Sequence, residues 1–361
     1  MNKQINAKFY FKTLITIILF FILYHLFIWF SFTSKIFNPK DGMFVGDLAR
    51  MSYQIDLSSP RRLEYNLSKD HLHKDNYNNQ QIDYLTIGDS FSRGGGHGVN
   101  PYYQDYFATK LDANVLNIRP SGEYTALETI IGLYNNGYLE KIKPKNIIVE
   151  SVVRIIPDRY SKEIDFDINN TSFVIEEKII NPENQQNVHV INTANYKLPF
   201  YTLMYNFKNN AQKNVYLFDL NKKLFSVGNG TKILILDDDV KNIPKFTHEN
   251  IIKINNNFNN VAKLLKEINI NLLFMPAPDK YDLYSKYIND KSYGNNPFFD
   301  LIDPLEKDYI FVNTKQILSS LLENGIQDVY HIDDTHWSYK ASEAISKDKL
   351  FYTIKNGSLC R

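Results

Sequence analysis

Two short motifs, far apart in the chain, contain the residue types of a Ser-His-Asp triad. Gly88–Ser92 (GDSFS) places Ser90 directly after an apolar run, and Asp333–Trp337 (DDTHW) places His336 beside two acids. A serine hydroxyl is a weak nucleophile at neutral pH, so it needs an adjacent base, and that base needs an acid to orient it. Because triads are recognised by geometry and not by sequence spacing, the two motifs together predict acyl-transfer chemistry.

Within such a triad, His336 would take the proton of Ser90 and later deliver it to the leaving oxygen. Either Asp333 or Asp334 could hold the other ring nitrogen, and the sequence alone leaves both open. Each motif also has a structural interpretation. The serine motif occurs in ordinary β-turns, His336 could be a structural residue packed near Trp337, and an aspartate could cap the helix expected at 340–345.

The elements that must position Ser90 form an alternating β/α pattern that begins at residue 83. A strand at 84–87 ends at Gly88, which puts Ser90 at the carboxyl end of a strand, where open α/β sheets bind their ligands. Further strands are predicted at 115–118, 146–150, 271–275 (stopped by Pro276) and 310–312, and helices at 101–110, 125–134, 251–268 and 314–323. This alternation predicts an α/β fold with three layers, in which helices flank both faces of a parallel sheet.

Two segments do not follow this pattern. Residues 35–80 are polar and are predicted as a stem, with a short strand at 42–48. Residues 160–245 contain β-like runs such as 172–175 and are predicted as an inserted β-rich segment that covers or borders the site. The acidic run 237–239 could hold a cation, but we expect an ordinary acidic turn because no further oxygen ligands follow at a suitable spacing. Residues 81–361 are therefore predicted as one domain that contains an insertion.

An uncharged apolar run near the N-terminus predicts a membrane anchor. No Asp, Glu, Lys or Arg occurs between Lys12 and Lys35, and a helix of that length spans the ~30 Å hydrocarbon layer. A cleaved signal peptide is the alternative, but its apolar core is usually shorter, ~7–15 residues. We expect residues 13–34 to cross the membrane and, because lysines precede them, residues 1–12 to be cytoplasmic.

Composition excludes several classes of function. The formal net charge is +1 with acids and bases interspersed, so no electrostatic footprint for nucleic acid is present. The single cysteine, Cys360, excludes a disulfide framework and a cysteine-based metal site. We expect neither a cofactor nor a metal ion, as suits a triad that works through its own side chains.

The two motifs resemble those of the SGNH (GDSL) hydrolase superfamily. More narrowly, the chain is similar to the branch that contains alginate O-acetyltransferases and related cell-envelope polysaccharide O-acyltransferases. Val149–Arg154 (VESVVR) resembles that branch's strand ending in Glu with an Arg four residues on, and Met275–Tyr284 (MPAPDKYDLY) resembles its Pro-x-Pro-x-Lys segment with a nearby Tyr. The resemblance covers roughly residues 83–341, without the insertion.

The resemblance implies a role for each motif residue. Ser90 is the nucleophile and His336 the base; the acid is Asp334 in the Asp-Thr-His form of the motif and Asp333 in the more general Asp-x-x-His form. Gly122 fits the glycine whose N–H joins that of Ser90 in the oxyanion hole, whereas the family's asparagine donor has no match. Known alginate acetyltransferases carry the histidine motif before the serine motif. The opposite order here argues against alginate as the substrate.

Several further residues are predicted as substrate contacts, and most have a structural alternative. They are Arg93 and His97 beside the nucleophile, Glu150 and Arg154 after the third strand, Lys280, and Trp337. Glu150, which stands near the place of the missing asparagine, could instead form an ion pair with Arg154 at the sheet edge. Lys280 could equally be a solvated surface lysine.

Together these features predict a serine O-acyltransferase anchored in the bacterial inner (cytoplasmic) membrane by a single span, with its catalytic domain outside the cytoplasm. The resemblance implies that it moves an acyl group, an acetyl group in the first instance, to a hydroxyl of a cell-envelope or exported polysaccharide. It also implies a polytopic membrane-bound O-acyltransferase as the partner that supplies the acyl group. An esterase acting on envelope glycan or lipid is the first alternative, because water can replace the sugar hydroxyl. A non-catalytic scaffold that binds glycan is the second.

Overall fold

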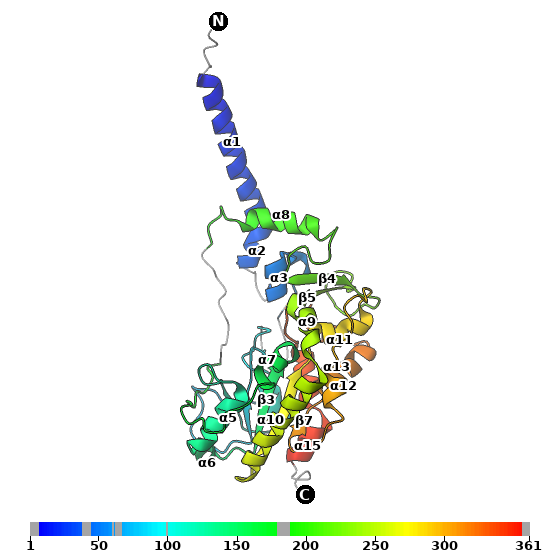
Figure 1. The fold of residues 1–361 in the computed structure, drawn as a ribbon. Helices are drawn as coiled ribbons and strands as arrows, with labels where there is room; N and C mark the ends of the chain where they lie inside the picture. The colour runs from blue at the N-terminus through cyan, green and yellow to red at the C-terminus, as the bar shows by residue number, and fades with distance from the viewer. Residues whose placement is uncertain are drawn as a thin grey trace.

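A five-stranded parallel sheet lies at the centre of the molecule (Figure 1). The computed structural model describes residues 7–37, 45–59, 61, 67–98, 100–178 and 188–355. The strand order is β2-β1-β3-β6-β7, and every neighbouring pair is parallel. The strands are β1 (Tyr84–Ile87), β2 (Val115–Ile118), β3 (Asn146–Val152), β6 (Asn271–Ala277) and β7 (Ile310–Phe311). All carboxyl ends therefore meet at one edge, as the sequence predicts.

Two strands are longer than predicted: β3 runs to Val152, and β6 is not ended by Pro276. Pro276 pairs in register with Ser151, and β6 continues to Ala277. A proline is tolerated in a strand where its missing N–H faces no partner. Here β7 pairs only with Leu273 and Phe274, and the Pro276 carbonyl accepts a hydrogen bond from the Thr314 hydroxyl beyond the end of β7. The proline thus interrupts no ladder hydrogen bond on that side.

Helices cover both faces of the sheet, which gives the three layers. Successive strand residues point to opposite faces, so Ile148 belongs to one apolar core while Ile147 and Val149 belong to the other. The first core is covered by α4 (Tyr103–Lys110), α13 (Thr314–Glu323), α14 (Tyr339–Ser346) and α15 (Lys349–Lys355). The second is covered by α5 (Ala126–Asn135), α6 (Tyr138–Ile142), α7 (Ile156–Tyr160), α10 (His248–Lys266) and α12 (Phe298–Ile302). The α/β class is thus shown.

Capping side chains fix where the principal helices begin. Thr125 and Glu128 form a capping box at the start of α5, and Thr247 accepts from the Asn250 N–H at the start of α10. Asn313 caps α13 in the same way. The shorter helices are η2 (Ile55–Leu57), η3 (Val153–Ile155), η4 (Ile243–Lys245), α11 (Lys280–Tyr284) and η5 (Ser285–Tyr287).

Among its described residues, the predicted insertion contains a small antiparallel sheet, two α-helices and the short helix η4. Its strands are β4 (Val215–Asp219) and β5 (Lys232–Leu236), and its helices are α8 (Ala194–Met204) and α9 (Asp237–Lys241). The run expected to be β-like at 172–175 forms only an isolated bridge between Ile175 and Ile118. The acidic run 237–239 is not a turn: it starts α9, which suits acids because a helix N-terminus carries a partial positive charge.

Residues 45–57 of the segment predicted as a polar stem pack against this small sheet. Residues 42–44 of the expected short strand lie outside the described residues, and the remainder leads into a helix, α3 (Asp47–Ser52). Val45, Leu48 and Ala49 form an apolar cluster with Val215 and Leu234 of β4 and β5. The strand prediction was wrong because this burial of one helical face outweighs the short apolar run.

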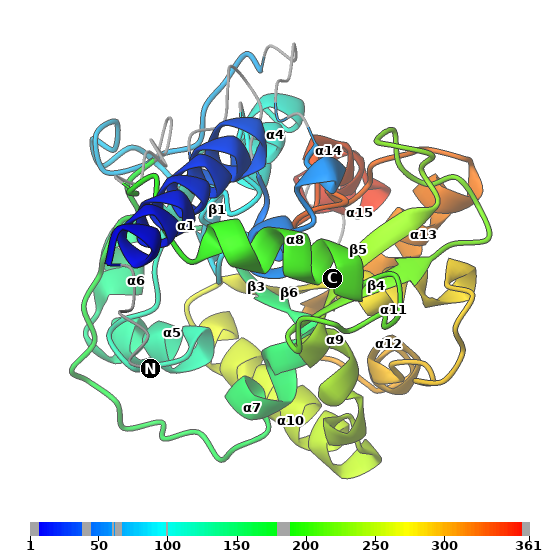
Figure 2. The same ribbon diagram turned by 90° about the horizontal axis from the view of Figure 1, so that it is seen from above.

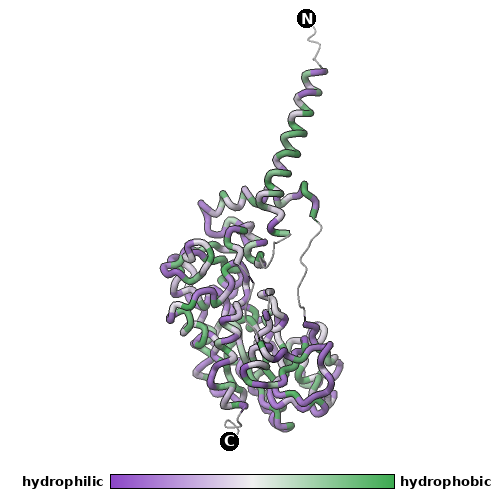
Figure 3. Tube along the Cα trace, turned by 180° about the vertical axis from the view of Figure 1, so that it is seen from behind, coloured by the Kyte–Doolittle hydropathy of each residue, from purple (hydrophilic) through white to green (hydrophobic). Residues whose placement is uncertain are grey.

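A long apolar helix projects from the body at the N-terminus (Figures 1 and 3). It consists of α1 (Ala7–Ile28), a π-helical stretch η1 (Trp29–Thr33) and α2 (Ser34–Phe37). Most large side chains of α1 are exposed, among them Phe20 at 73%. By length and composition this helix can cross a membrane, and the predicted span 13–34 lies within it.

Candidate functional site

The turn that carries Ser90 is built where β1 ends. A Cβ atom at Gly88 would overlap Ser92 Oγ and Glu150 Oε2, so only glycine fits at this position. Ser90 itself is exposed, while Asp89 and Phe91 on either side are buried. The Ser90 carbonyl accepts from the Gly95 N–H at 2.8 Å, which folds the following glycine-rich turn back onto the serine. The hydroxyl is thereby presented at the carboxyl edge of the sheet.

Ser90, His336 and Asp334 form a continuous hydrogen-bonded chain. Ser90 Oγ lies 2.7 Å from His336 Nε2, and His336 Nδ1 lies 2.6 Å from Asp334 Oδ1. The His336 N–H also donates to Asp334 Oδ1 at 3.1 Å. Folding therefore brings together the two motifs that are distant in sequence, with an acid on the far ring nitrogen.

Electrostatics favour a charged pair behind the serine. Burial opposes the charged form of Asp334, but the hydrogen bond and charge of His336, with help from Arg61, hold the pKa of this carboxyl well below its usual value. Burial also opposes the imidazolium, yet the hydrogen bond and charge of Asp334 raise the pKa of His336 above its ordinary value. Such an acid stabilises the imidazolium that forms when the histidine accepts a proton.

The structure distinguishes the two adjacent aspartates that the sequence left open. Asp333 accepts from the Gly46 N–H at 2.9 Å, from the Ser59 hydroxyl at 2.8 Å and from the Arg61 guanidinium at 2.9 Å. Asp334, in contrast, contacts His336 directly. Asp334 therefore occupies the position of a triad acid, whereas Asp333 joins the loop around His336 to the N-terminal segment.

Two residues that sequence reasoning missed, Asp47 and Arg61, hold the loop of residues 331–336, hereafter the acid loop. Asp47 accepts from the Thr335 N–H at 2.8 Å and from the Thr335 hydroxyl at 2.6 Å. Arg61 donates to Asp333 and, at 3.4 Å, to Asp334, and its Nε–H donates to the Gly96 carbonyl at 2.9 Å. Arg61 thus joins the acid loop to the turn that follows Ser90. Both residues lie in the predicted stem, where no motif marks them.

Lys280 and Trp337, predicted as substrate contacts, are interior residues. Lys280 is 1% exposed, and its ammonium donates to the His331 and Ile332 carbonyls at 2.9 and 3.0 Å. Burial lowers the pKa of Lys280 to about 8. Trp337 packs edge-on against Phe91 with ring centroids 4.7 Å apart. Because both are covered, we assign them no substrate contact; they support the acid loop.

Glu150 and Arg154 are close in sequence but have separate partners. Glu150 is fully buried, and its Oε2 accepts from the Asp89 N–H at 3.1 Å and the Ser92 hydroxyl at 2.8 Å. Burial, followed by the charge of Asp89, raises the pKa of Glu150 well above its usual value. Arg154 pairs instead with two other acids, Asp239 at 3.2 Å and Asp279 at 3.5 Å. The ion pair between Glu150 and Arg154, one of the two predicted readings, is not formed.

A cleft of about 480 Å³ opens beside the serine hydroxyl. Its lining includes Ser90, Arg93, Tyr124, Arg154, Arg159 and Tyr160. Each arginine already has an acid partner: Arg93 has Glu176 at 3.0 Å, and Arg159 has Asp89 at 2.8 Å. The cleft thus presents aromatic side chains together with guanidinium groups whose charges are partly neutralised, which suits a polar, uncharged or weakly anionic ligand.

Gly122 lies at the margin of this cleft, whereas His97 lies outside it. Gly122 has a φ of +57° in the loop between Pro120 and Glu123, both of which line the cleft. His97, also with a φ of +57°, lies in the turn after Ser90 but does not line the cleft. Burial lowers the pKa of His97 to about 4, against the opposing charge of Asp334. The imidazole is therefore neutral at physiological pH.

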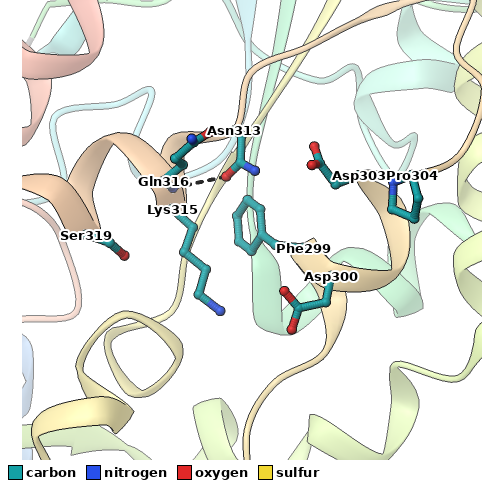
Figure 4. Close-up of a pocket in the computed structure, with 8 residues that line it drawn as sticks. All are labelled: Phe299, Asp300, Asp303, Pro304, Asn313, Lys315, Gln316 and Ser319. Atoms are coloured by element: carbon teal, nitrogen blue, oxygen red, sulfur yellow. Dashed lines mark hydrogen bonds between the residues drawn. The ribbon is translucent and has the colours of Figure 1, made fainter.

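A second hollow, of about 500 Å³, lies at the β7 edge of the sheet, between α12 and α13 (Figure 4). Asp300 and Lys315 face it, together with Phe299 and Gln316. Lys315 already pairs with Asp282 at 2.6 Å. No residue of this hollow contacts the triad within the described part of the chain, so we assign it no chemistry.

Asp47, Asp334 and His336 also meet the geometric requirement for a metal site, since one ligand atom of each lies within 4.8 Å of the others. Hydrogen bonds within the protein already engage these atoms: His336 with Asp334, and Asp47 with Thr335. Their arrangement is accounted for by the triad and its support.

Comparisons with known proteins leave the site to be interpreted from its own geometry. No protein-family model matches the chain, and no curated protein matches it. The features that bear on function are the two motifs, the hydrogen-bonded chain from Ser90 to Asp334 and the apolar N-terminal helix.

Proposed function

We propose that the protein is a serine acyl-transfer enzyme with Ser90 as nucleophile, His336 as base and Asp334 as the orienting acid. The observation that carries this proposal is the 2.7 Å contact between an exposed serine hydroxyl and an imidazole whose other nitrogen is held by a buried carboxylate. A structural histidine would not need an exposed serine at the mouth of a cleft. The SGNH resemblance of the same residues supports the proposal independently.

In the proposed reaction, Ser90 Oγ attacks the carbonyl carbon of an acyl ester while His336 Nε2 takes the hydroxyl proton. The tetrahedral intermediate collapses, its C–O bond to the leaving group breaks, and His336 returns the proton to the departing oxygen. An acceptor hydroxyl then attacks the acyl-serine as His336 takes its proton. The new ester forms, the bond to Ser90 breaks, and the serine regains a proton, so no other reactant is needed.

The developing oxyanion would be held by backbone N–H groups of Ser90 and Gly122. Neither N–H donates to an acceptor among the residues that the structure describes. Backbone donors aimed at a developing negative charge are among the largest contributions to such catalysis. Glu150 stands near the family's asparagine donor in sequence, but its buried carboxyl faces Asp89 and Ser92, so we give it no part in the oxyanion hole.

We further propose that the enzyme O-acylates, with acetyl as the first group to test, a cell-envelope or exported polysaccharide outside the cytoplasm of a bacterium. The N-terminal helix supports an anchor in the inner membrane, and the SGNH-type motifs support the acyltransferase branch. Acyl donors are made in the cytoplasm, so a polytopic membrane-bound O-acyltransferase is the proposed supplier. An esterase using the same three residues is the alternative, and it differs only in the acceptor, water.

Covalent labelling tests the nucleophile. The full-length protein in detergent, treated with a fluorophosphonate probe, is expected to carry the label on the peptide containing Ser90, as read by mass spectrometry. Ser90→Ala should abolish labelling, whereas Ser226→Ala, which removes another exposed hydroxyl, should not. Labelling that survives Ser90→Ala would show that another residue is the reactive nucleophile, and labelling that never appears in the folded wild type would favour a non-catalytic scaffold.

Acceptor dependence separates the transferase from the esterase. With 4-nitrophenyl acetate as donor, a transferase is expected to release 4-nitrophenol faster when an oligosaccharide acceptor is added and to yield acetylated sugar. Release that is indifferent to the sugar, with acetate as the only product, would favour the esterase. Ser90→Ala serves as the blank in both arms.

A further inference from the structure

One face of α8 is apolar and exposed. Tyr196, Phe200 and Leu203 of α8 are 47%, 56% and 57% exposed, and Phe207, in the turn that follows the helix, is 75% exposed. Spacings of four and three residues place the first three side chains on one side of the helix, and Phe207 follows four residues further along the chain. A contiguous row of large apolar side chains on the surface marks a contact with another molecule or with a membrane.

The opposite face of α8 is already used by the protein. Leu198 is buried, Tyr201 stacks on Tyr53 with ring centroids 5.6 Å apart, and the Tyr205 hydroxyl donates to the Val215 carbonyl at 2.8 Å. These contacts seat α8 on α3 and β4. A helix that is apolar on both sides needs cover on both sides, and in the described chain only one side has it.

The N-terminal helix fixes where α8 lies relative to a membrane. The Tyr24 hydroxyl donates to the Asn195 carbonyl at 2.8 Å, and the His25 ring lies 2.7 Å from both the Tyr196 hydroxyl and the Asn195 amide nitrogen. Figures 1 and 2 show α8 running across the foot of α1, on the top of the body. The exposed face of α8 is directed away from the body, on the side from which α1 rises.

We propose that α8 lies in the outer membrane–water interface of the bilayer crossed by α1, with its exposed apolar face among the lipid acyl chains. Interfacial helices bury such a face roughly 5–10 Å deep, with cationic side chains at the headgroups. Lys197 and Lys208, exposed on the flanks of this row, are placed to meet lipid phosphates. Because α8 is attached to the helix that crosses the membrane, lipid is the molecule that we expect to cover its exposed face.

The length of α1 agrees with this placement. From Ala7 to Leu23, before the first contact with α8, a helix extends about 26 Å, close to the ~30 Å hydrocarbon thickness. Lys8 and Lys12 can reach the cytoplasmic headgroups by extending their side chains along the helix. The span is then the N-terminal part of the helix, shifted from the predicted 13–34. His25 and Trp29, both buried, belong to the contact with the body.

The placement of α8 in the membrane interface would also orient the proposed active site. This consequence rests on the proposed function. In Figure 1, α3 lies between α8 and the parallel sheet, and Asp47 of α3 holds Thr335 of the acid loop. The edge that carries Ser90 is thereby coupled to the membrane-bound end of the molecule. A substrate delivered from the membrane would meet the nucleophile without travelling around the body.

Spin labels test the proposal without any assay of activity. In a Cys360→Ser background, the full chain would carry a nitroxide at Phe200→Cys or Leu203→Cys, and would be reconstituted in vesicles of phosphatidylethanolamine and phosphatidylglycerol. Tyr352→Cys, an exposed site in α15 at the opposite end of the body, is the matched control. Labels at 200 and 203 are expected to show a ratio of oxygen to nickel-complex collisions roughly fivefold above that at 352.

The vesicles contain only lipid and this chain, so other occupants give different results. Equal ratios at the three sites would overturn the proposal, because the face would then be in water or need a partner protein. A ratio that rises with protein density in the vesicle would also overturn it, in favour of contact between copies of the chain. Circular dichroism of each labelled variant checks that the fold is retained.

Discussion

The serine side and the acid side of the proposed triad are held in different ways. Around Ser90 the supporting groups come from adjacent strand ends: Glu150 accepts from the Asp89 N–H at 3.1 Å, and Asp89 accepts from the Val152 N–H at 2.9 Å. The acid loop belongs to no strand of the parallel sheet. Side chains from distant segments hold it, with Arg61 and Asp47 on one side and Lys280 on the other.

This difference gives the two sides different sensitivities. The turn that carries Ser90 is held by the ends of adjacent strands, so the hydrogen-bond ladder that folds the sheet also fixes this turn. A loop held by buried ion pairs depends on each partner, because removing one leaves the other charged and uncompensated in the interior. Changes in the acid loop can therefore separate catalysis from stability, and the adjacent Asp333 and Asp334 provide a matched pair for doing so.

The largest effect is expected from Asp334→Asn. The amide cannot stabilise the imidazolium and favours the wrong tautomer of His336, so kcat with 4-nitrophenyl acetate should fall roughly 10⁴-fold. Thermal unfolding followed by circular dichroism should change less than it does for the neighbouring substitution at Asp333. Activity close to that of the wild type would show that His336 does not work with this carboxylate.

A smaller loss of activity, with a larger loss of stability, is expected from Asp333→Asn. Asp333 accepts from Gly46, Ser59 and Arg61, and an amide nitrogen in place of one oxygen would face a donor. The free energy of unfolding should fall by about 2 kcal/mol, while kcat should fall by no more than about tenfold, because His336 keeps its own acid. If Asp333→Asn abolished activity while Asp334→Asn spared it, the two roles would be reversed.

The difference between the strand-supported Ser90 turn and the acid loop also explains which parts of the site could be predicted from the sequence. Short apolar runs predicted all five strands of the parallel sheet to within two residues at each end, since a buried parallel strand is encoded by its own residues. The motifs predicted Ser90 and His336 because their chemistry needs particular residue types. Asp47 and Arg61 carry no local signal: their role depends on a contact across most of the chain, which neither periodicity nor spacing encodes.

The substrate contacts were the least predictable part of the site. Lys280 was predicted as a substrate contact or a solvated surface lysine, and Glu150 as a substrate contact or an ion-pair partner of Arg154. Charged side chains are usually exposed, yet both are buried. Each finds its partners only after folding: backbone carbonyls of the acid loop for Lys280, and the Asp89 turn for Glu150. A charged residue at the end of a parallel strand is thus as compatible with bracing a loop as with binding a ligand.

The smallest expected effect, and the most specific test of long-range support, is a shift in pH dependence. The pKa of His336 is raised mainly by Asp334, but the charge of Asp47 contributes in the same direction. A base must be neutral to accept a proton, so kcat/KM falls as pH drops through this raised pKa. Asp47→Asn removes one negative charge, lowers the pKa of His336, and should move the acid limb of the profile to lower pH by about half a unit.

If Asp47 had only a structural role, Asp47→Asn would not move the acid limb of the pH profile of kcat/KM. Loss of the hydrogen bonds to Thr335 could lower kcat/KM at every pH, but the midpoint would stay where it is in the wild type. Glu249→Gln, which removes an exposed acid of α10 paired with Lys253, is the control and should leave the profile unchanged. If Asp47→Asn shifted the limb upward, the charge of Asp47 could not be acting on the imidazole, and the support of the acid side would be a matter of packing alone.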